Sequence, residues 1–379
     1  MKTRYAMKSV LTLAACGTAL AIGLGIVCPP SLVGQADPPN YEVDPYWPKP
    51  LPQNWVLGEA AGVCVDAHDH VFVLNRRNFA STGFELKDGL TGNELDAARP
   101  APPVIEFDAE GNVVNSWGEP DVLPRQTHHC AFDSEGNVWI TGSWDGIVQK
   151  WTHDGSKLLV QIGTRGVYDT SDGTVTGRAL NSSHAAFFRP AGVWVDQGNG
   201  DVYIGDGYGN SRVAVFDRNG QFLRQWGRQG TKSEAEEGVG GAFIQVVHCV
   251  TIGNDGLVYV CDRQGDRVQV FDKMGTFQKN IWVRNGTPLP DAPSGTAQQV
   301  AFSSDSAQKF MYVGNEHNER VDILDHASGK ILGSFGRAGH QPGGFGHIHS
   351  IATDSKGNMY IGEVNWGRRV QKFKISGAQ

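Results

Sequence analysis

Three histidines recur at matching positions in a repeating sequence, and their spacing suggests a metal site. Aligned by their first apolar run, six similar segments open on Ala61, His129, Ala191, His248, Gln298 and His349. Histidine is thus confined to the second, fourth and sixth segments. If the segments form a ring, alternate segments are related by about 120°, so the three imidazoles meet at the axis. His128, beside His129, is expected on the opposite face of its strand.

Three imidazoles leave a fourth coordination position open, which is typical of catalytic rather than structural zinc sites. We therefore predict that His129, His248 and His349 bind one Zn²⁺, and other divalent transition metals also suit imidazole. The competing interpretation is that each histidine is a hydrogen-bonded structural residue of a channel.

Further polar residues fall where the second strand of each segment is expected to end, near the mouth of the same channel. They are Arg76, Arg77, Tyr208, Arg263, His317 and Asn365. A tyrosine beside a cation and a metal can act as a general base, and an arginine can bind a carboxylate through two nitrogens. We predict catalytic roles for Tyr208, Arg76 and Arg263, and substrate contacts for Arg77, His317 and Asn365.

His347 is one more candidate for substrate contact. It lies two residues before His349, so on a strand both side chains point to the same side. A role as a fourth metal ligand, which would close the site, is the alternative.

The elements that must position these residues are short strands. Each segment reads as an apolar alternation, a turn rich in Asp, Asn and Gly, and a second and third alternation, as in residues 130–151, 192–216 and 249–271. Such turns favour hairpins. One four-stranded meander cannot bury both of its faces, but six arranged radially can.

The predicted fold is therefore all-β, a six-bladed β-propeller. The last segment lacks a fourth strand, which residues 41–47 (YEVDPYW) could supply, so an N-terminal strand would close the ring. The first segment carries an insertion, about residues 78–101, between its second and third strands.

Composition and charge narrow the classes of partner. The chain has 379 residues, of which 40% are hydrophobic, and a formal net charge of −7. There is no block of basic residues, so electrostatics give no reason to expect nucleic acid or an anionic membrane.

The N-terminus resembles an export signal. Lys2, Arg4 and Lys8 precede an apolar run to about Cys28, and Gly34-Gln35-Ala36 offers a cleavage site. We predict a secretory signal over residues 1–36, a lead-in with the closing strand over 37–54, and the propeller over 55–376. The protein would be secreted or periplasmic, with no stable membrane span after cleavage. An uncleaved anchor and a lipoprotein acylated at Cys16 are the alternatives.

Four cysteines follow the leader: Cys64, Cys130, Cys249 and Cys261. Their spacing is not that of a zinc ribbon. Cys249 and Cys261 face each other across a predicted hairpin, so an oxidising compartment would permit a disulfide. Adjacent antiparallel strands strain such a bond, which favours buried free thiols.

The segment VYIGDGYGNSRVAVFDRNGQFLRQWG (202–227), together with residues 257–271 and 358–373, resembles the peptidyl-α-hydroxyglycine α-amidating lyases, within the NHL-repeat propellers. The resemblance covers roughly residues 55 to 375. It implies NHL-type four-stranded blades, zinc on His129, His248 and His349, a catalytic Tyr208, and active-site Arg76 and Arg263. The implied reaction cleaves the C–N bond of an N-acyl-α-hydroxyglycine, as a small molecule or peptide, to an amide and glyoxylate.

Three positions depart from that family. Its methionine near the third zinc ligand falls on His347, its calcium-binding aspartate on Ser350, and its cysteine beside the tyrosine on Gly209. A structural calcium is therefore not expected, and the substrate need not be the standard one. The chain shows no monooxygenase region, so a peptide-amidating role calls for a separate monooxygenase partner.

Two other classes of function compete with a lyase. A hydrolase, such as a lactonase, or a hydratase would use the same metal to activate water. A non-enzymatic scaffold would bind partners through its faces. A scaffold would keep its function after loss of the three histidines, whereas either enzyme would lose its activity. Glyoxylate would be released by the lyase and not by the hydrolase.

Overall fold

The computed structural model describes residues 37–77, 99–283 and 295–376. The described residues form one compact unit. The leader over residues 1–36, with its cleavage and lipidation alternatives, lies outside the described residues, as does most of the insertion predicted at 78–101. No helix among the described residues is long and apolar enough to cross a membrane.

Six four-stranded antiparallel sheets build the molecule, which confirms the predicted all-β six-bladed propeller. Blade one consists of β3 (Glu59–Val65), β4 (Val71–Arg76), β6 (Val104–Phe107) and β7 (Val113–Trp117). Blade two consists of β8 (Thr127–Phe132), β9 (Val138–Gly142), β10 (Val148–Trp151) and β11 (Leu158–Ile162). Blade three consists of β12 (Pro190–Val195), β13 (Val202–Asp206), β14 (Arg212–Phe216) and β15 (Phe222–Trp226).

Blade four consists of β18 (Val247–Ile252), β19 (Val258–Asp262), β20 (Arg267–Phe271) and β21 (Phe277–Trp282). Blade five consists of β22 (Gln299–Phe302), β23 (Phe310–Asn315), β24 (Arg320–Asp325) and β25 (Ile331–Phe335). Blade six consists of β26 (Ile348–Thr353), β27 (Met359–Glu363), β28 (Val370–Ser376) and β1 (Asn40–Asp44). Small elements lie between blades: the parallel pairs β2 (Trp55–Val56) with β5 (Arg99–Pro100) and β16 (Arg228–Gln229) with β17 (Ala242–Phe243), and the helix α2 (Lys232–Glu236).

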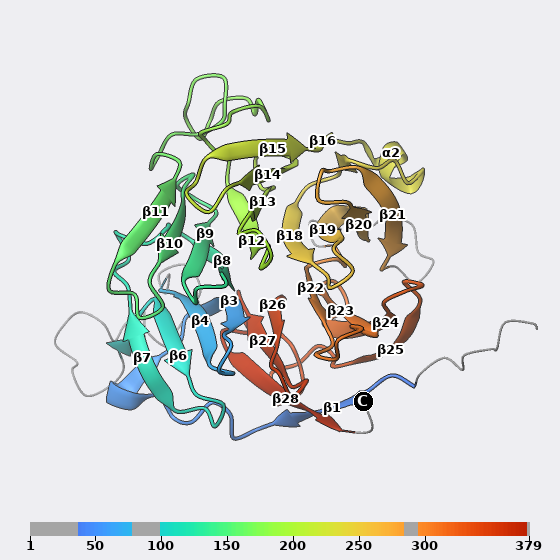
Figure 1. Cartoon of the computed structure of the whole chain (residues 1–379). Helices are drawn as coiled ribbons and strands as arrows, with labels where there is room; N and C mark the ends of the chain where they lie inside the picture. Colours follow the sequence, from blue (N-terminus) through green and yellow to red (C-terminus); the bar gives the residue numbers. More distant parts are fainter. Residues whose placement is uncertain (1–36, 78–98, 284–294, 377–379) are drawn as a thin grey trace, which may run out of the picture. The chain divides into compact units, whose positions relative to one another are not determined.

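The ring is closed by the N-terminal strand, as predicted. β1 pairs antiparallel with β28, so the sixth blade contains both ends of the described chain. In Figure 1, blue β1 lies beside red β28, and the first strands of the blades surround the central channel. Each of these inner strands contacts its neighbours in the ring.

Apolar side chains fill the interfaces between neighbouring blades. One cluster joins Cys249 and Tyr259 of blade four to Val300 and Met311 of blade five. Equivalent clusters occupy the other interfaces, so each sheet buries both of its faces against its neighbours.

An Asp-Gly turn recurs between the first and second strands. In blade two, Asp133 Oδ1 accepts hydrogen bonds from the backbone N–H of Glu135 and Asn137, at 3.0 and 2.9 Å. Gly136 takes the positive φ of 79° that the turn requires. Blade six repeats the arrangement around Asp354, which fixes where each pair of strands reverses.

All four cysteines after the leader form disulfides, so the expectation of free thiols is wrong. Cys249 lies in a bulge of β18 opposite Cys261, and their Cα atoms are 4.9 Å apart, within the range that a disulfide tolerates. Cys64 and Cys130 join the inner strands of blades one and two, with Cα atoms 5.8 Å apart.

Candidate functional site

Three buried histidines meet on the axis of the propeller: His128, His248 and His349. One ring nitrogen of each lies within 4.8 Å of the others. The ring centroids are 4.6 Å apart for His128 and His248, 4.5 Å for His128 and His349, and 5.0 Å for His248 and His349. We call this group the histidine cluster.

The structure corrects one member of the predicted set, because His128 and not His129 joins His248 and His349. The inner strands that carry these histidines, β8, β18 and β26, each contain a bulge near their start, so strand alternation fails there. Thr127, Val247 and Ile348 occupy the same register position before the bulge, and the histidine that follows each of them enters the cluster.

His129 faces the other way along the channel. Its Nδ1 lies 3.1 Å from Val193 O, and its Nε2 lies 3.0 Å from Gln299 Nε2. Since Gln299 lies on the inner strand of blade five, this contact joins blades two and five beside the cluster. Ser350, at the matching position of blade six, accepts a hydrogen bond from Val63 N and so ties blade six to blade one.

Hydrogen bonds orient two members of the cluster. His248 Nδ1 lies 2.7 Å from Gln298 O, and His349 Nδ1 lies 2.6 Å from Ala61 O. A carbonyl can only accept, so each Nδ1 carries the proton and each Nε2 keeps its lone pair. His128 Nδ1 is buried without a hydrogen-bond partner among the described residues.

Burial lowers the pKa of all three cluster histidines well below the usual value. The positive charges of Arg76 at His349 and of Arg263 at His248 lower the pKa further. Neutral imidazoles with available lone pairs are the form that binds a divalent transition metal. The donor set and the unpartnered His128 Nδ1 therefore fit a resident metal ion.

Tyr208 stands beside the histidine cluster, on the loop between β13 and β14. Its Oη lies 3.2 Å from His128 Nε2 and accepts a hydrogen bond from Arg263 Nη1 at 3.4 Å. The guanidinium groups of Arg189 and Arg263 are each 5.5 Å from the phenol ring centroid. Of these neighbours, sequence reasoning missed Arg189.

Arg76 is held at the end of β4 with 8% of its surface exposed. Its Nε donates to Thr127 O at 2.7 Å, and its Nη1 donates to Glu59 Oε2 at 3.1 Å. These contacts fix the guanidinium close enough to His128 and His349 to lower their pKa. The structure thus brings Tyr208, Arg76 and Arg263 together around the cluster.

Ion pairs with a buried carboxylate bracket the loops that carry the site residues. Asp206 pairs with Arg212 at 3.1 Å across the loop of Tyr208, and Asp262 pairs with Arg267 at 2.8 Å across that of Arg263. In blade six, Glu363 and Arg369 pair at 2.7 Å around the loop of Asn365. Each pair ties the end of the second strand to the start of the third.

His347 and Asn365 form a third group at this mouth. Asn365 Nδ2 lies 2.9 Å from His347 Nδ1, and His347 Nε2 lies 3.3 Å from Glu316 Oε1. Both ring nitrogens of His347 are therefore engaged outside the histidine cluster. Burial and the charges of Arg263 and Arg76 lower the His347 pKa to about 4.

Two predicted contact residues lie farther out. His317 is exposed, whereas Glu316, the residue before it, is buried against His347. Arg77 is also exposed and lines a surface pocket with Arg125 and Gln126.

The backbone is strained at four points where the chain enters the inner strands. Gln126, Arg189, Gln245 and His347 all have positive φ, from 54° to 94°. Non-glycine residues in this region cost about 1–3 kcal/mol each and cluster at functional sites.

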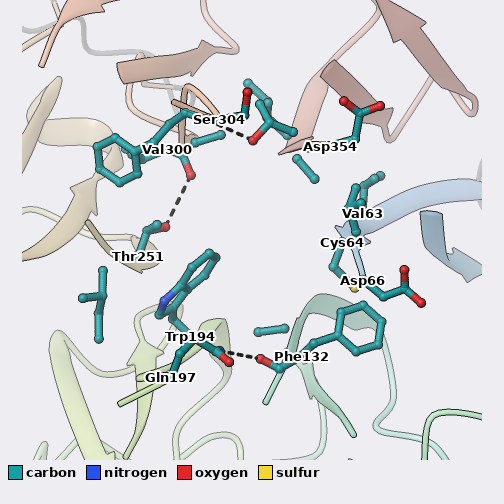
Figure 2. Close-up of a pocket in the computed structure, with 18 of the residues that line it drawn as sticks. Val63, Cys64, Asp66, Phe132, Trp194, Gln197, Thr251, Val300, Ser304 and Asp354 are labelled. Carbon is teal, nitrogen blue, oxygen red and sulfur yellow. Dashed lines mark hydrogen bonds between the residues drawn. The ribbon is translucent and has the colours of Figure 1, made fainter. Parts of the chain in front are cut away.

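The opposite mouth of the channel holds a cavity of about 640 Å³. Figure 2 shows its wall, with Phe132, Trp194 and Val300 contributed by different blades. His129 and Gln299 line this cavity, which places His129 on the side away from Tyr208.

Comparisons with known proteins agree with this architecture. The NHL repeat family model matches residues 187–216, the first three strands of blade three. The chain is 26% identical over 350 residues to peptidyl-glycine alpha-amidating monooxygenase B of Xenopus laevis, covering 90% of this chain and 36% of that protein. It is 25% identical over 337 residues to peptidyl-alpha-hydroxyglycine alpha-amidating lyase 1 of Drosophila melanogaster, covering 86% and 58%.

A further relative, NHL repeat-containing protein 3 of Homo sapiens, is 26% identical over 342 residues, covering 88% of this chain and 84% of that protein. The resemblance to the amidating lyases and the NHL-repeat proteins is thus confirmed. The chain spans less than two thirds of the length of the Xenopus and Drosophila proteins. An auxiliary nutrient binding protein from Bacteroides thetaiotaomicron has a TM-score of 0.55 at 13% identity, covering 85% of this chain and 70% of that chain. That likeness concerns the fold alone.

Proposed function

We propose that this chain is a metal-dependent lyase that cleaves the C–N bond of an N-acyl-α-hydroxyglycine-like substrate, giving an amide and glyoxylate. The observation that carries the proposal is the position of Tyr208, whose Oη lies 3.2 Å from His128 in the histidine cluster and within reach of Arg263. The names of the Xenopus and Drosophila relatives point in the same direction.

We assign the metal to His128, His248 and His349, with Zn²⁺ as the first candidate. When bound, a divalent metal supplies Lewis-acid stabilisation of negative charge that develops on oxygen. The histidines contribute neutral nitrogen donors, two of them oriented by the carbonyls of Gln298 and Ala61.

Tyr208 is assigned the role of general base. As its phenolate, it takes the proton of the substrate hydroxyl, the O–H electron pair forms the carbonyl, and the C–N pair leaves with the nitrogen. Arg263, already hydrogen-bonded to Tyr208, stabilises the phenolate. Arg76, fixed by Glu59 and Thr127, offers a preorganised positive charge for the substrate carboxylate.

We also propose export of the protein, with residues 1–36 as the signal segment. The leader sequence and the two disulfides Cys64–Cys130 and Cys249–Cys261 are consistent with an oxidising compartment. The substrate would come from a separate monooxygenase that hydroxylates the α-carbon of a glycine-extended peptide or N-acylglycine.

The first test is glyoxylate release from N-benzoyl-α-hydroxyglycine by the zinc-loaded chain. Glyoxylate and benzamide in equal amounts support the lyase. Ester or lactone hydrolysis without glyoxylate would favour the hydrolase, and no turnover of either substrate would leave a binding scaffold.

The Tyr208→Phe variant tests the assigned base. We expect it to keep its zinc and its fold while kcat falls by about 10²–10⁴-fold, the range for loss of a general base. Zinc content and circular dichroism serve as controls. Turnover equal to that of the unchanged chain would exclude Tyr208 as the base.

A further inference from the structure

Glu316 is a buried carboxyl group without a complete set of partners. It follows β23, with 7% of its surface exposed. Its Oε1 lies 3.3 Å from His347 Nε2, and its Oε2 is buried without a hydrogen-bond partner among the described residues. Because an unsatisfied buried polar atom is costly, such an atom at a functional site calls for an explanation.

The neighbours of Glu316 connect it to the proposed active site. Arg263 acts electrostatically on Glu316 and also donates a hydrogen bond to Tyr208 Oη. Tyr208 and Glu316 therefore share one guanidinium, which places two proton-exchanging groups around Arg263. His347, held by Asn365 through Nδ1, presents Nε2 to Glu316 Oε1, so Oε2 is the oxygen left without a hydrogen-bond partner among the described residues.

Cleavage of the C–N bond requires two proton transfers. The hydroxyl oxygen loses a proton as the carbonyl forms, and the amide nitrogen gains one as it leaves, because an amide anion is a poor leaving group. Tyr208 accounts for the first transfer only.

We propose that Glu316, through Oε2, donates the proton to the leaving amide nitrogen of this substrate. This inference rests on the proposed lyase function. The electron pair of the C–N bond goes to nitrogen, the nitrogen takes the Glu316 proton, and Glu316 becomes a carboxylate that His347 Nε2–H stabilises. After products leave, solvent returns a proton to Glu316 and removes one from Tyr208, so no oxidant or reductant is consumed.

The electrostatic surroundings suit this role. Burial raises the pKa of Glu316 to about 7; the charge of Arg263 opposes the shift, and that of Glu319 adds to it. An acid is most effective when its pKa lies near the working pH. The protonated form is required, so its contribution is complete well below pH 7 and is lost as the pH rises through about 7. Among the described residues, the charged or titratable groups that act on Glu316 are Arg263, Glu319 and His347.

The test is Glu316→Gln in the zinc-loaded full chain, assayed with N-benzoyl-α-hydroxyglycines whose para substituent runs from methoxy to nitro. We expect kcat for the unsubstituted substrate to fall by about 10²-fold or more. The loss of kcat should be smaller for the nitro compound, because its amide leaves more easily without an acid. The decrease of kcat of the unchanged chain as the pH rises through about 7 should be absent from the variant. Glu316→Asp should recover part of the rate.

Two controls separate chemistry from folding. Glu106→Gln removes another buried carboxyl, paired with His70 at 2.6 Å between β6 and the first turn of blade one, and should leave the kinetics unchanged. Infrared difference spectra should show a protonated-carboxyl band that titrates near pH 7 in the unchanged chain and is missing from Glu316→Gln, whatever the activity.

The outcomes distinguish this inference from the lyase proposal. If Glu316→Gln keeps the kcat and its decrease at alkaline pH while Tyr208→Phe loses turnover, the lyase stands and Glu316 is excluded as the acid. If the unchanged chain releases no glyoxylate from any of these substrates, both proposals are overturned.

Discussion

At the scale of single residues, the neighbours His128 and His129 provide an internal comparison. Both are buried, but His128 faces His248 and His349, whereas His129 contacts Val193 and Gln299. We expect His128→Ala to lose the bound metal and His129→Ala to keep about one metal ion per chain, because only the former removes a ligand. Elemental analysis after zinc loading measures this directly.

The same two variants can also contradict the assignment of His128 as a metal ligand. Retention of zinc by His128→Ala, or its loss from a folded His129→Ala, would return the site to the originally predicted set. Circular dichroism and gel filtration confirm that both variants are folded before the metal is counted.

The two histidines also explain where sequence reasoning fell short. His129-Cys130 resembles His248-Cys249, and alignment of the segments by their first apolar run paired these two histidines. Counting back from the positive-φ glycine of the following turn places His128, His248 and His349 at the same distance from Gly136, Gly256 and Gly357, which would have found the correct residue.

Glu316 was missed for a different reason. Its neighbour His317 was predicted to contact the substrate because histidine often does so. In the turn after β23, however, His317 is exposed and Glu316 is buried. Tyr208, Arg76 and Arg263 could be predicted because the hairpin turns place the end of every second strand at the same mouth of the channel.

At the scale of elements, buried ion pairs hold the loops of the site in place. Arg267 has no exposed surface; it pairs with Asp262 at 2.8 Å and donates to Ala242 O at 2.6 Å. In Arg267→Met, the carboxylate of Asp262 stays buried without its counter-ion. We expect the free energy of unfolding to fall by about 3–5 kcal/mol, measured by guanidinium denaturation.

Arg218→Met is the matched control, because Arg218 is exposed and lies 4.0 Å from Glu135. Its removal should change stability little, as is usual for surface ion pairs. Arg267→Met should also reduce turnover, since Arg263 lies on the bracketed loop. Equal stability of the two variants would contradict the role given to the buried pair.

The disulfides show what strand patterns leave undetermined. Cys249 and Cys261 share a hairpin, so their proximity was predictable, but the bulge that brings them into bonding geometry was not. Cys64 and Cys130 meet only because blades one and two are neighbours in the ring, which no local pattern specifies.

At the scale of the whole molecule, ring closure depends on the short strand β1. The six repeats predicted the number of blades, and the missing fourth strand of the last repeat predicted the closure. Within β1, Tyr41 stacks on Phe335 at 4.9 Å and meets the edge of Tyr312 at 5.7 Å, both in blade five. Its Oη donates to Gly357 O at 3.3 Å. Tyr41 thus joins the closing strand to both of the last two blades.

We therefore expect Tyr41→Ala to lower the free energy of unfolding by about 3 kcal/mol, the usual loss for a packed aromatic ring. Because β1 also covers the edge of β28, loosening it exposes unpaired backbone groups and should promote association between molecules. Denaturant unfolding and light scattering measure the two effects. Tyr46→Ala is the control, since Tyr46 is 77% exposed just beyond β1. If both variants unfold at the same denaturant concentration, closure does not depend on the packing of Tyr41, and the pairing of β1 with β28 alone holds the ring.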